Sequence, residues 1–178
     1  MTERLPEPLP EAWLRGPIDG VEPHLMPVFH SFAQVREDLA LHTAGLTTEQ
    51  VWTRAGALPS LGFHLRHIAH SVDRLVTYLC GGELTTAQTD TLKQETVPGA
   101  TLDELLAQVD QQLREAENRL RTIPASALYD PRWVGKKRLP TNVLGLLTHV
   151  AEHTQRHLGQ AITTAKLARG AVNASSRT

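Results

Sequence analysis

Three histidines lie four residues apart in the segment HVAEHTQRHLGQ, residues 149–160: His149, His153 and His157. Side chains four residues apart on a helix share one face, about 5–6 Å apart at Cβ, so two imidazoles can bind one metal ion. All three cannot share one ion, because each step of four climbs a further turn. The apolar stripe of this segment passes closest to His157 and furthest from His149, so His153 and His157 are the candidate pair.

A second group of histidines lies upstream in SLGFHLRHIAHS, residues 60–71, and contains His64, His67 and His70. A third ligand from this segment would complete a three-histidine site and leave one coordination position open for water or substrate, as in catalytic zinc sites. His64 lies slightly closer to the apolar seam than His67, but the spacing does not decide between them. His70 points away from the seam and is expected to be a solvated surface residue.

These histidines need helices to position them, and the sequence predicts four. Apolar residues recur at spacings of three and four, the pattern of an amphipathic helix with one buried stripe. The predicted helices cover residues 23–44, 60–80, 101–123 and 141–168. No alternation of period two predicts a strand. The expected fold is therefore an all-α four-helix bundle.

Residues that cap helices support these boundaries. Two patterns fit the capping box, in which the side chains of two residues bind free backbone amides at a helix start: Thr47 with Gln50, and Thr101 with Glu104. Further N-caps are expected at Ser60 and Thr141.

The connection over residues 81–100 is far longer than a hairpin between antiparallel helices requires. At about 3.3 Å per residue, it can cross a bundle of roughly 30 Å built from helices of about 20 residues. We therefore expect a long crossover here, with the second and third helices parallel.

The connection over residues 124–140 concentrates basic side chains beside Trp133, directly before the histidine helix. One interpretation is a solvated turn. The functional interpretation is a basic lip on a pocket, formed by Arg132, Lys136 and Arg138, which binds the carboxylates of a substrate.

Composition limits the class of protein. The chain has 178 residues, with 18 basic and 19 acidic side chains and a formal net charge of −1. That balance gives no basic surface for nucleic acid or a membrane, and no apolar run is long enough to span a bilayer. The single cysteine leaves no partner for a disulfide within the chain and fits a reducing compartment. We expect a soluble, cytoplasmic protein with an extended segment over 1–22, a bundle over 23–169 and a flexible tail over 170–178.

The two histidine segments together resemble the DinB/YfiT-like superfamily. The similarity rests on GFHLRHIAHS and HVAEHTQRHLGQ and extends over residues 25–168, including the long second connection. It implies a four-helix bundle with a crossover, a divalent metal site of three histidines, and often a homodimer. Matched residue by residue, the resemblance assigns the ligands to His67, His153 and His157.

Two positions next to the last ligand test the match. Gly159 and Gln160 agree with many members of the superfamily. Leu158 stands where many members have Arg, so an expected basic group is missing or is supplied from elsewhere.

The resemblance also implies an activity, the transfer of a low-molecular-weight thiol to an electrophile. A divalent metal with an open position can bind and deprotonate a thiol, so the chemistry suits the site. Imidazole ligands suit several metals, of which we expect zinc or nickel, with iron as a further option.

Two alternatives stay open. Metal-assisted hydrolysis would use the same open position for a water with a pKa of about 7, and needs a general base. Glu152 is the only acid in the motif, and it is rotated about 100° from His153, which weighs against hydrolysis. The other alternative is a stress-related bundle with a structural metal and no activity.

Overall fold

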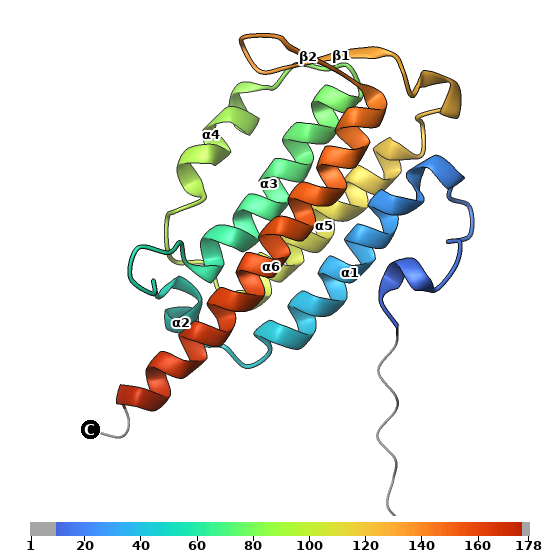
Figure 1. Cartoon of the computed structure of the whole chain (residues 1–178). Coiled ribbons are helices and arrows are strands. Elements are labelled where there is room, and N and C mark those ends of the chain that lie inside the picture. Colours follow the sequence, from blue (N-terminus) through green and yellow to red (C-terminus); the bar gives the residue numbers. More distant parts are fainter. Residues whose placement is uncertain (1–9, 176–178) are drawn as a thin grey trace, which may run out of the picture.

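The computed structural model describes residues 10–175, which form a bundle of four long helices with shorter elements attached (Figure 1). The long helices are α1 (Met26–Thr43), α3 (Leu61–Leu79), α5 (Leu102–Leu120) and α6 (Val143–Ser175). The shorter elements are η1 (Ala12–Leu14), η2 (Pro23–Leu25), α2 (Thr48–Trp52), α4 (Thr86–Gln94), η3 (Ala125–Ala127), β1 (Pro131–Val134) and β2 (Leu139–Asn142). The predicted all-α bundle is confirmed.

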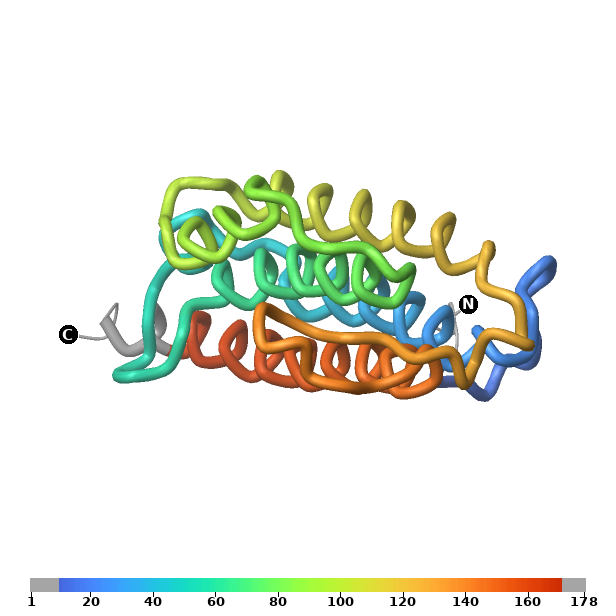
Figure 2. The backbone as a smooth tube through the Cα atoms, turned by 90° about the horizontal axis from the view of Figure 1, so that it is seen from above, coloured from blue at the N-terminus to red at the C-terminus, as the bar shows by residue number. Residues whose placement is uncertain are grey.

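Hydrogen bonds between the long helices give their directions. His70 of α3 pairs with Gln108 of α5, and further along both helices Thr77 pairs with Arg119. The partners advance together, so α3 and α5 are parallel, and the predicted crossover is confirmed. Seen from above, α5 and α6 lie on opposite sides of α3 (Figure 2). Helix α6 runs antiparallel to α3 and in the same direction as α1 (Figure 1).

The predicted apolar seams form the core of the bundle. Leu65, Ile68 and Val72 of α3 are fully buried, as are Leu113 of α5 and Val150 of α6. Burying a side chain of this size contributes about 1.5–3 kcal/mol. This packing holds α3 against both α5 and α6, and so fixes the frame that carries the histidines.

Most of the predicted caps are present. The capping boxes that begin at Thr47 and Thr101 make both of their hydrogen bonds, and Ser60 caps the start of α3. The prediction for Thr141 was wrong, because this residue lies in β2. The side chain of Asn142 instead accepts a hydrogen bond from the backbone amide three residues further on, at the start of α6.

The crossover contains a helix that the periodicity did not predict. Helix α4 begins with a further capping box, Thr85 with Gln88, but none of its residues is buried. A helix without an apolar stripe has no hydrophobic period to recognise, because its contacts to the bundle are polar.

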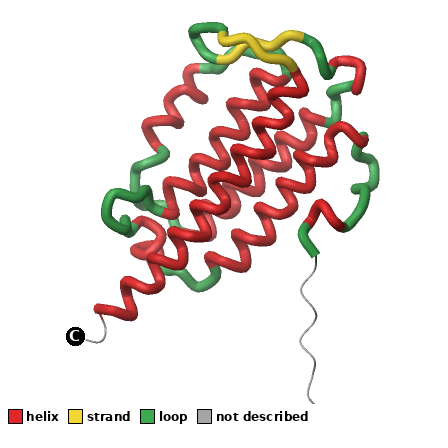
Figure 3. The backbone as a smooth tube through the Cα atoms, in the orientation of Figure 1, coloured by secondary structure: helices red, strands yellow, loops and turns green. Residues whose placement is uncertain are grey.

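The connection before α6 folds as a β-hairpin across the end of the bundle (Figure 3). Strands β1 and β2 pair antiparallel, with Trp133 opposite Pro140. The sequence predicted no strand here. Each strand has only four residues, and none of them is buried, so the alternation that marks a half-buried strand is too short to stand out.

The ends of the chain differ from the predicted boundaries. Helix α6 continues past its predicted end to Ser175, so residues 170–175 of the predicted tail are helical, and residues 176–178 lie outside the described residues. The predicted extended segment 1–22 contains η1, and its first part, residues 1–9, is likewise not described. In the part of the chain that the structure describes, no helix has the length and apolar character needed to cross a membrane.

Candidate metal centre

Three of the predicted residues meet between two helices. His67 projects from α3, and His153 and His157 project from α6. Each offers one ring nitrogen, and these three atoms all lie within 4.8 Å of one another. The His67 ring centroid lies 4.2 Å from that of His157, and the His153 and His157 centroids are 4.7 Å apart. The structure therefore forms a cluster that could hold a metal ion.

The spacing of the nitrogens fits a divalent ion. The Nε2 atoms of His67 and His153 are 3.1 Å apart. Two nitrogens bound to a tetrahedral zinc at 2.0–2.1 Å lie about 3.3 Å apart, so this pair is already close to the spacing that zinc requires. The Nδ1 atom of His153 is buried without a hydrogen-bond partner, so only the Nε2 atom of this ring has a protein partner, His67.

A buried carboxylate fixes the orientation of His67. Glu95 follows α4 and is only 3% exposed. Its Oε2 accepts a hydrogen bond from His67 Nδ1 at 2.8 Å, and its Oε1 accepts one from Arg74 at 3.0 Å. A carboxylate can only accept, so His67 Nδ1 carries the proton and Nε2 is left with its lone pair toward the other histidines. This is the outer hydrogen bond typical of metal-binding histidines.

The environment keeps Glu95 ionised. Burial by itself raises the pKa of this carboxyl, but the hydrogen bonds from His67 and Arg74, together with the nearby His70, outweigh burial and hold the pKa well below its usual range. The sequence did not identify Glu95, because it lies in the crossover, away from both histidine segments. No motif in the sequence marks a single acid that becomes buried by a tertiary contact.

The prediction for His70 was wrong. It was expected at the surface, but it is only 8% exposed, and its Nε2 accepts a hydrogen bond from Gln108 at 2.9 Å. Its Nδ1 lies 3.6 Å from Glu95 Oε1. The face of α3 opposite the main seam is covered by α5 and by the crossover, which is why a polar residue there is buried.

Burial favours the neutral form of three histidines. It is the main cause that lowers the pKa of His64 to about 4, and electrostatic repulsion by His67 adds to it. Burial, followed by the same repulsion, lowers the pKa of His153 to about 4 and that of His157 to about 3. Only the neutral imidazole binds a metal, so burial favours the metal-binding form of His153 and His157.

His64 lies beside the cluster. Periodicity favoured it slightly, and it is indeed more deeply buried than His67, at 3% exposure. Its Nδ1 lies 3.3 Å from His157 Nδ1. The group of three converging nitrogens nevertheless contains His67.

The third histidine of the row lies outside the cluster. His149 has a side chain that is 44% exposed, and it bonds Glu152 at 2.7 Å. Glu152 also bonds Arg156. Both of the carboxylates near the histidines, Glu95 and Glu152, are therefore already paired with basic groups.

The cluster borders a cavity of about 490 Å³, which His64 and His157 line together with Phe63 and Leu58. The Phe63 ring stacks on His67, with centroids 5.4 Å apart and an angle of 18° between the planes. A small molecule in this cavity would contact one side of the histidine cluster.

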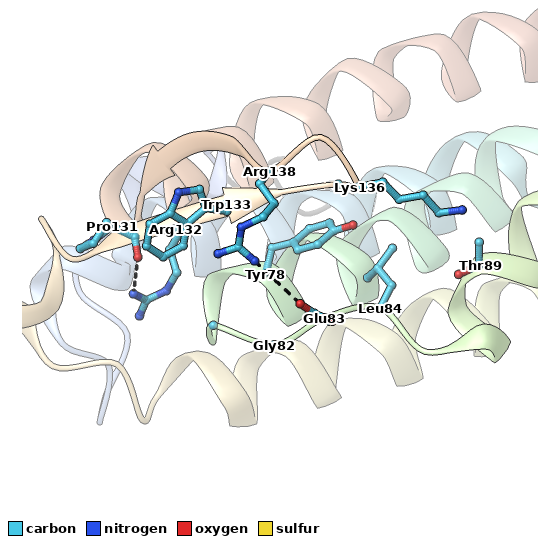
Figure 4. Close-up of a pocket in the computed structure, with 12 residues that line it drawn as sticks. Tyr78, Gly82, Glu83, Leu84, Thr89, Pro131, Arg132, Trp133, Lys136 and Arg138 are labelled. Atoms are coloured by element: carbon cyan, nitrogen blue, oxygen red, sulfur yellow. Dashed lines mark hydrogen bonds and ion pairs between the residues drawn. The ribbon is translucent and has the colours of Figure 1, made fainter.

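The predicted basic lip lines a different pocket, of about 780 Å³, at the end of the bundle (Figure 4). The pocket contains Arg132, Lys136 and Arg138, together with Tyr78, but none of the three clustered histidines. Figure 4 shows the Arg132 side chain turned away from Lys136, and it bonds backbone carbonyls.

The other two cations of the lip differ in their pairing. Arg138 lies 3.8 Å from Glu83 and 5.0 Å from the centre of the Trp133 ring. Lys136 makes no ion pair or side-chain hydrogen bond with any residue that the structure describes.

Comparison with known proteins agrees with this geometry. A family model described as the DinB superfamily matches residues 31–161, most of the chain and all three clustered histidines. No curated protein matched the chain.

Proposed function

The chain belongs to the DinB superfamily, and we propose that it is a metal-dependent transferase that adds a low-molecular-weight thiol to an electrophile. The observation that carries this proposal is the convergence of three histidine nitrogens from α3 and α6 beside a cavity. Three protein ligands leave a coordination position open, the arrangement of catalytic rather than structural sites.

His67, His153 and His157 would hold the ion, with zinc or nickel expected and iron as a further option. A bound divalent ion supplies a charge of +2, which neutral imidazoles leave uncompensated and which favours a thiolate over a thiol. The protein's own part is to favour the neutral form of His153 and His157 by burial and to orient His67 through Glu95.

The pairing of the carboxylates favours thiol transfer over hydrolysis. A hydrolase needs a general base close to the metal. Glu95 is occupied by His67 and Arg74, and Glu152 by His149 and Arg156. A thiol that a bound metal deprotonates would release its proton to solvent and would then need no such base for its attack. The apolar part of the cavity wall, which includes Leu58 and Phe63, suits an apolar group of the electrophile, and Arg156 also lines the cavity.

The basic lip would bind a carboxylate at the far end of the thiol. Lys136 is the cation available for this, because Arg132 and Arg138 already have partners. Tyr78 of the lip pocket lies eleven residues along α3 from His67, a rise of roughly 16 Å. A thiol as small as cysteine is too short to contact both places, so the proposal implies a longer thiol with an acidic end.

A thiol-consumption assay tests the proposal. Protein loaded with zinc or nickel should consume a low-molecular-weight thiol together with chlorodinitrobenzene or a maleimide, and treatment with a chelator should abolish this. The replacement His153→Ala should lose the activity with the metal. Lys136→Met should raise the KM for a long acidic thiol and leave the KM for cysteine unchanged.

Two results would overturn the proposal. Ester or amide turnover without any need for thiol would indicate a hydrolase. Bound metal with no turnover in either assay would indicate a structural metal in a non-enzymatic bundle.

A further inference from the structure

We infer that Glu95 is a positioning residue, which sets His67 in the form that binds metal and fastens the crossover to the metal site. The inference rests on the proposed metal site. It assigns a role to a residue outside both histidine segments, and it links α4 to a function.

The side chain of Glu95 is buried between the crossover and the bundle. In the crossover, residues 81–100, Glu95 is the one buried residue. An unpaired carboxylate in such a place costs several kcal/mol. Here it is bound by His67 and Arg74, with His70 nearby. The crossover is therefore anchored by a charge and its partners and not by an apolar side chain.

Helix α4 lies on α3 through polar contacts. Gln88 of α4 hydrogen-bonds Asp73 of α3 at 2.9 Å and Thr77 of α3 at 2.8 Å. Arg74 of α3 hydrogen-bonds Thr91 of α4 at 3.1 Å. Partly exposed hydrogen bonds of this kind open more readily than a packed apolar core. Arg66 of α3 also donates to the carbonyls of Gln94 and Val97, but these bonds are exposed. The carboxylate of Glu95 is thus the buried fixed point between the end of α4 and the bundle.

The hydrogen bond between His67 and Glu95 connects the crossover to the metal site. The proton on His67 Nδ1 is held by Glu95, which leaves Nε2 free to bind metal. A metal at Nε2 would hold the His67 ring in the orientation that Glu95 requires. Docking of the crossover and metal binding should therefore strengthen each other, and by thermodynamic linkage the effect must be reciprocal.

The variant Glu95→Gln separates the two roles of the carboxylate. A carboxylate accepts from His67 and Arg74 at once, whereas an amide has one acceptor oxygen and one donor group. If the oxygen faces Arg74, the NH₂ group faces His67 Nδ1 and forces the proton onto Nε2. If the oxygen faces His67, the NH₂ group opposes the guanidinium of Arg74. Either arrangement disfavours the docked, metal-binding form.

Zinc affinity, measured by competition with a chelator, tests the inference. Glu95→Gln should weaken zinc binding by about 10–100-fold, the usual effect of losing an outer partner of a ligand. The control is Glu83→Gln, an acid of the same crossover whose side chain is 91% exposed, and it should bind zinc as the wild type does. Equal affinity in the wild type and Glu95→Gln would overturn the inference.

Hydrogen exchange adds a measurement that a purely structural role would not change. Zinc should slow amide exchange in α4 of the wild type and of Glu83→Gln, but much less in Glu95→Gln. Exchange in α4 that is the same with and without zinc in the wild type would contradict the linkage.

A measurement on the wild type covers the case in which Glu95→Gln does not fold. In the zinc-loaded protein, ¹⁵N NMR should show His67 protonated at Nδ1 and bound through Nε2. Binding through Nδ1 would break the Glu95 contact and refute the inference. A wild type that binds no zinc would refute the site and the inference together. Normal zinc results without thiol turnover would refute the transferase alone.

Discussion

At the scale of single residues, the row of histidines in α6 divides by the direction of each side chain. His153 and His157 face α3 and join His67, whereas His149 is exposed and bonds Glu152. This division followed from the sequence, because a turn of 100° per residue places positions 153 and 157 nearer the apolar stripe. The choice of His67 came from the family resemblance, since the spacing of apolar residues slightly favoured His64.

Alanine replacements at these positions should therefore differ sharply. His153→Ala or His157→Ala removes one of three protein ligands and should weaken metal binding by more than the roughly 10–100-fold typical of an outer partner. Metal content per chain and competition with a chelator measure the effect. His149→Ala is the matched control from the same row and should retain the metal.

The same series decides between the two candidates on α3. His67→Ala should lose the metal as the α6 variants do, whereas His64→Ala should retain it. If His64→Ala lost the metal and His67→Ala retained it, the apolar stripe of α3 would have predicted the ligand better than the family resemblance.

Residues whose role depends on the crossover were beyond the reach of the sequence. His70 was expected in solvent, and Glu95 was not identified, because both are buried by tertiary contacts: His70 by α5 and the crossover, and Glu95 by His67 and Arg74 of α3. A helical wheel places a residue relative to its own helix only. It contains no information on a polar segment that later covers the opposite face.

At the scale of elements, predictions succeeded where a local signal coincided with a buried stripe. Helices α3 and α5 have both a predicted cap and a buried stripe, while α1 and α6 have the buried stripe, and the structure contains all four. Helix α4 has a capping box but no stripe, and the β-hairpin has neither buried residues nor length. Both lie in the long connections, where contacts with the finished bundle determine the structure.

Two glycines in helices provide a matched test of packing near the site. A Cβ added to Gly62 would lie 2.8 Å from ring atoms of Trp52, while one added to Gly159 would meet nothing within 4 Å. Gly62→Ala should lower the free energy of unfolding by about 1–3 kcal/mol through overpacking. It should also disturb the bond from Trp52 Nε1 to the Ala100 carbonyl at the end of the crossover.

The control variant should behave in the opposite way. Gly159→Ala should raise the free energy of unfolding by about 0.5–1 kcal/mol, because alanine loses less backbone entropy in a helix. Urea unfolding of both variants measures these changes. Equal effects at the two positions would mean that Trp52 does not pack on α3 as described.

At the scale of the whole molecule, the histidine cluster joins two helices that are far apart in the sequence. His67 is on α3, and the other two candidate ligands are on α6, on the side of α3 opposite α5 (Figure 2). A metal bound to the native cluster would have no comparable site in the unfolded chain, where these residues are not held together. Metal binding should therefore stabilise the whole bundle.

The stabilisation can be measured as a shift in Tm. Free metal at 100 times its Kd adds about 2.7 kcal/mol to the free energy of unfolding. For a chain of this length that corresponds to a rise in Tm of roughly 5–10 °C. His153→Ala, which lacks one ligand, should show little shift under the same conditions, and His149→Ala should shift as the wild type does.

The same experiment at lower pH tests the electrostatics of the site. In the folded, metal-free chain the pKa is about 4 for His153 and about 3 for His157, against an ordinary value of 6.5. Below pH 6.5 the unfolded chain therefore binds more protons than the folded one, so the stability of the metal-free protein should fall as the pH drops from 6.5 toward 4. His153→Ala removes one of these groups, so the stability of this variant should fall less steeply as the pH drops. The gain in Tm from metal should shrink only as the pH approaches 4, because in the folded chain protons begin to compete for the nitrogens of His153 and then His157 near these lowered pKa values. A metal-free protein whose stability does not change between pH 6.5 and 4 would mean that the buried histidines are as accessible to protons in the bundle as in the unfolded chain.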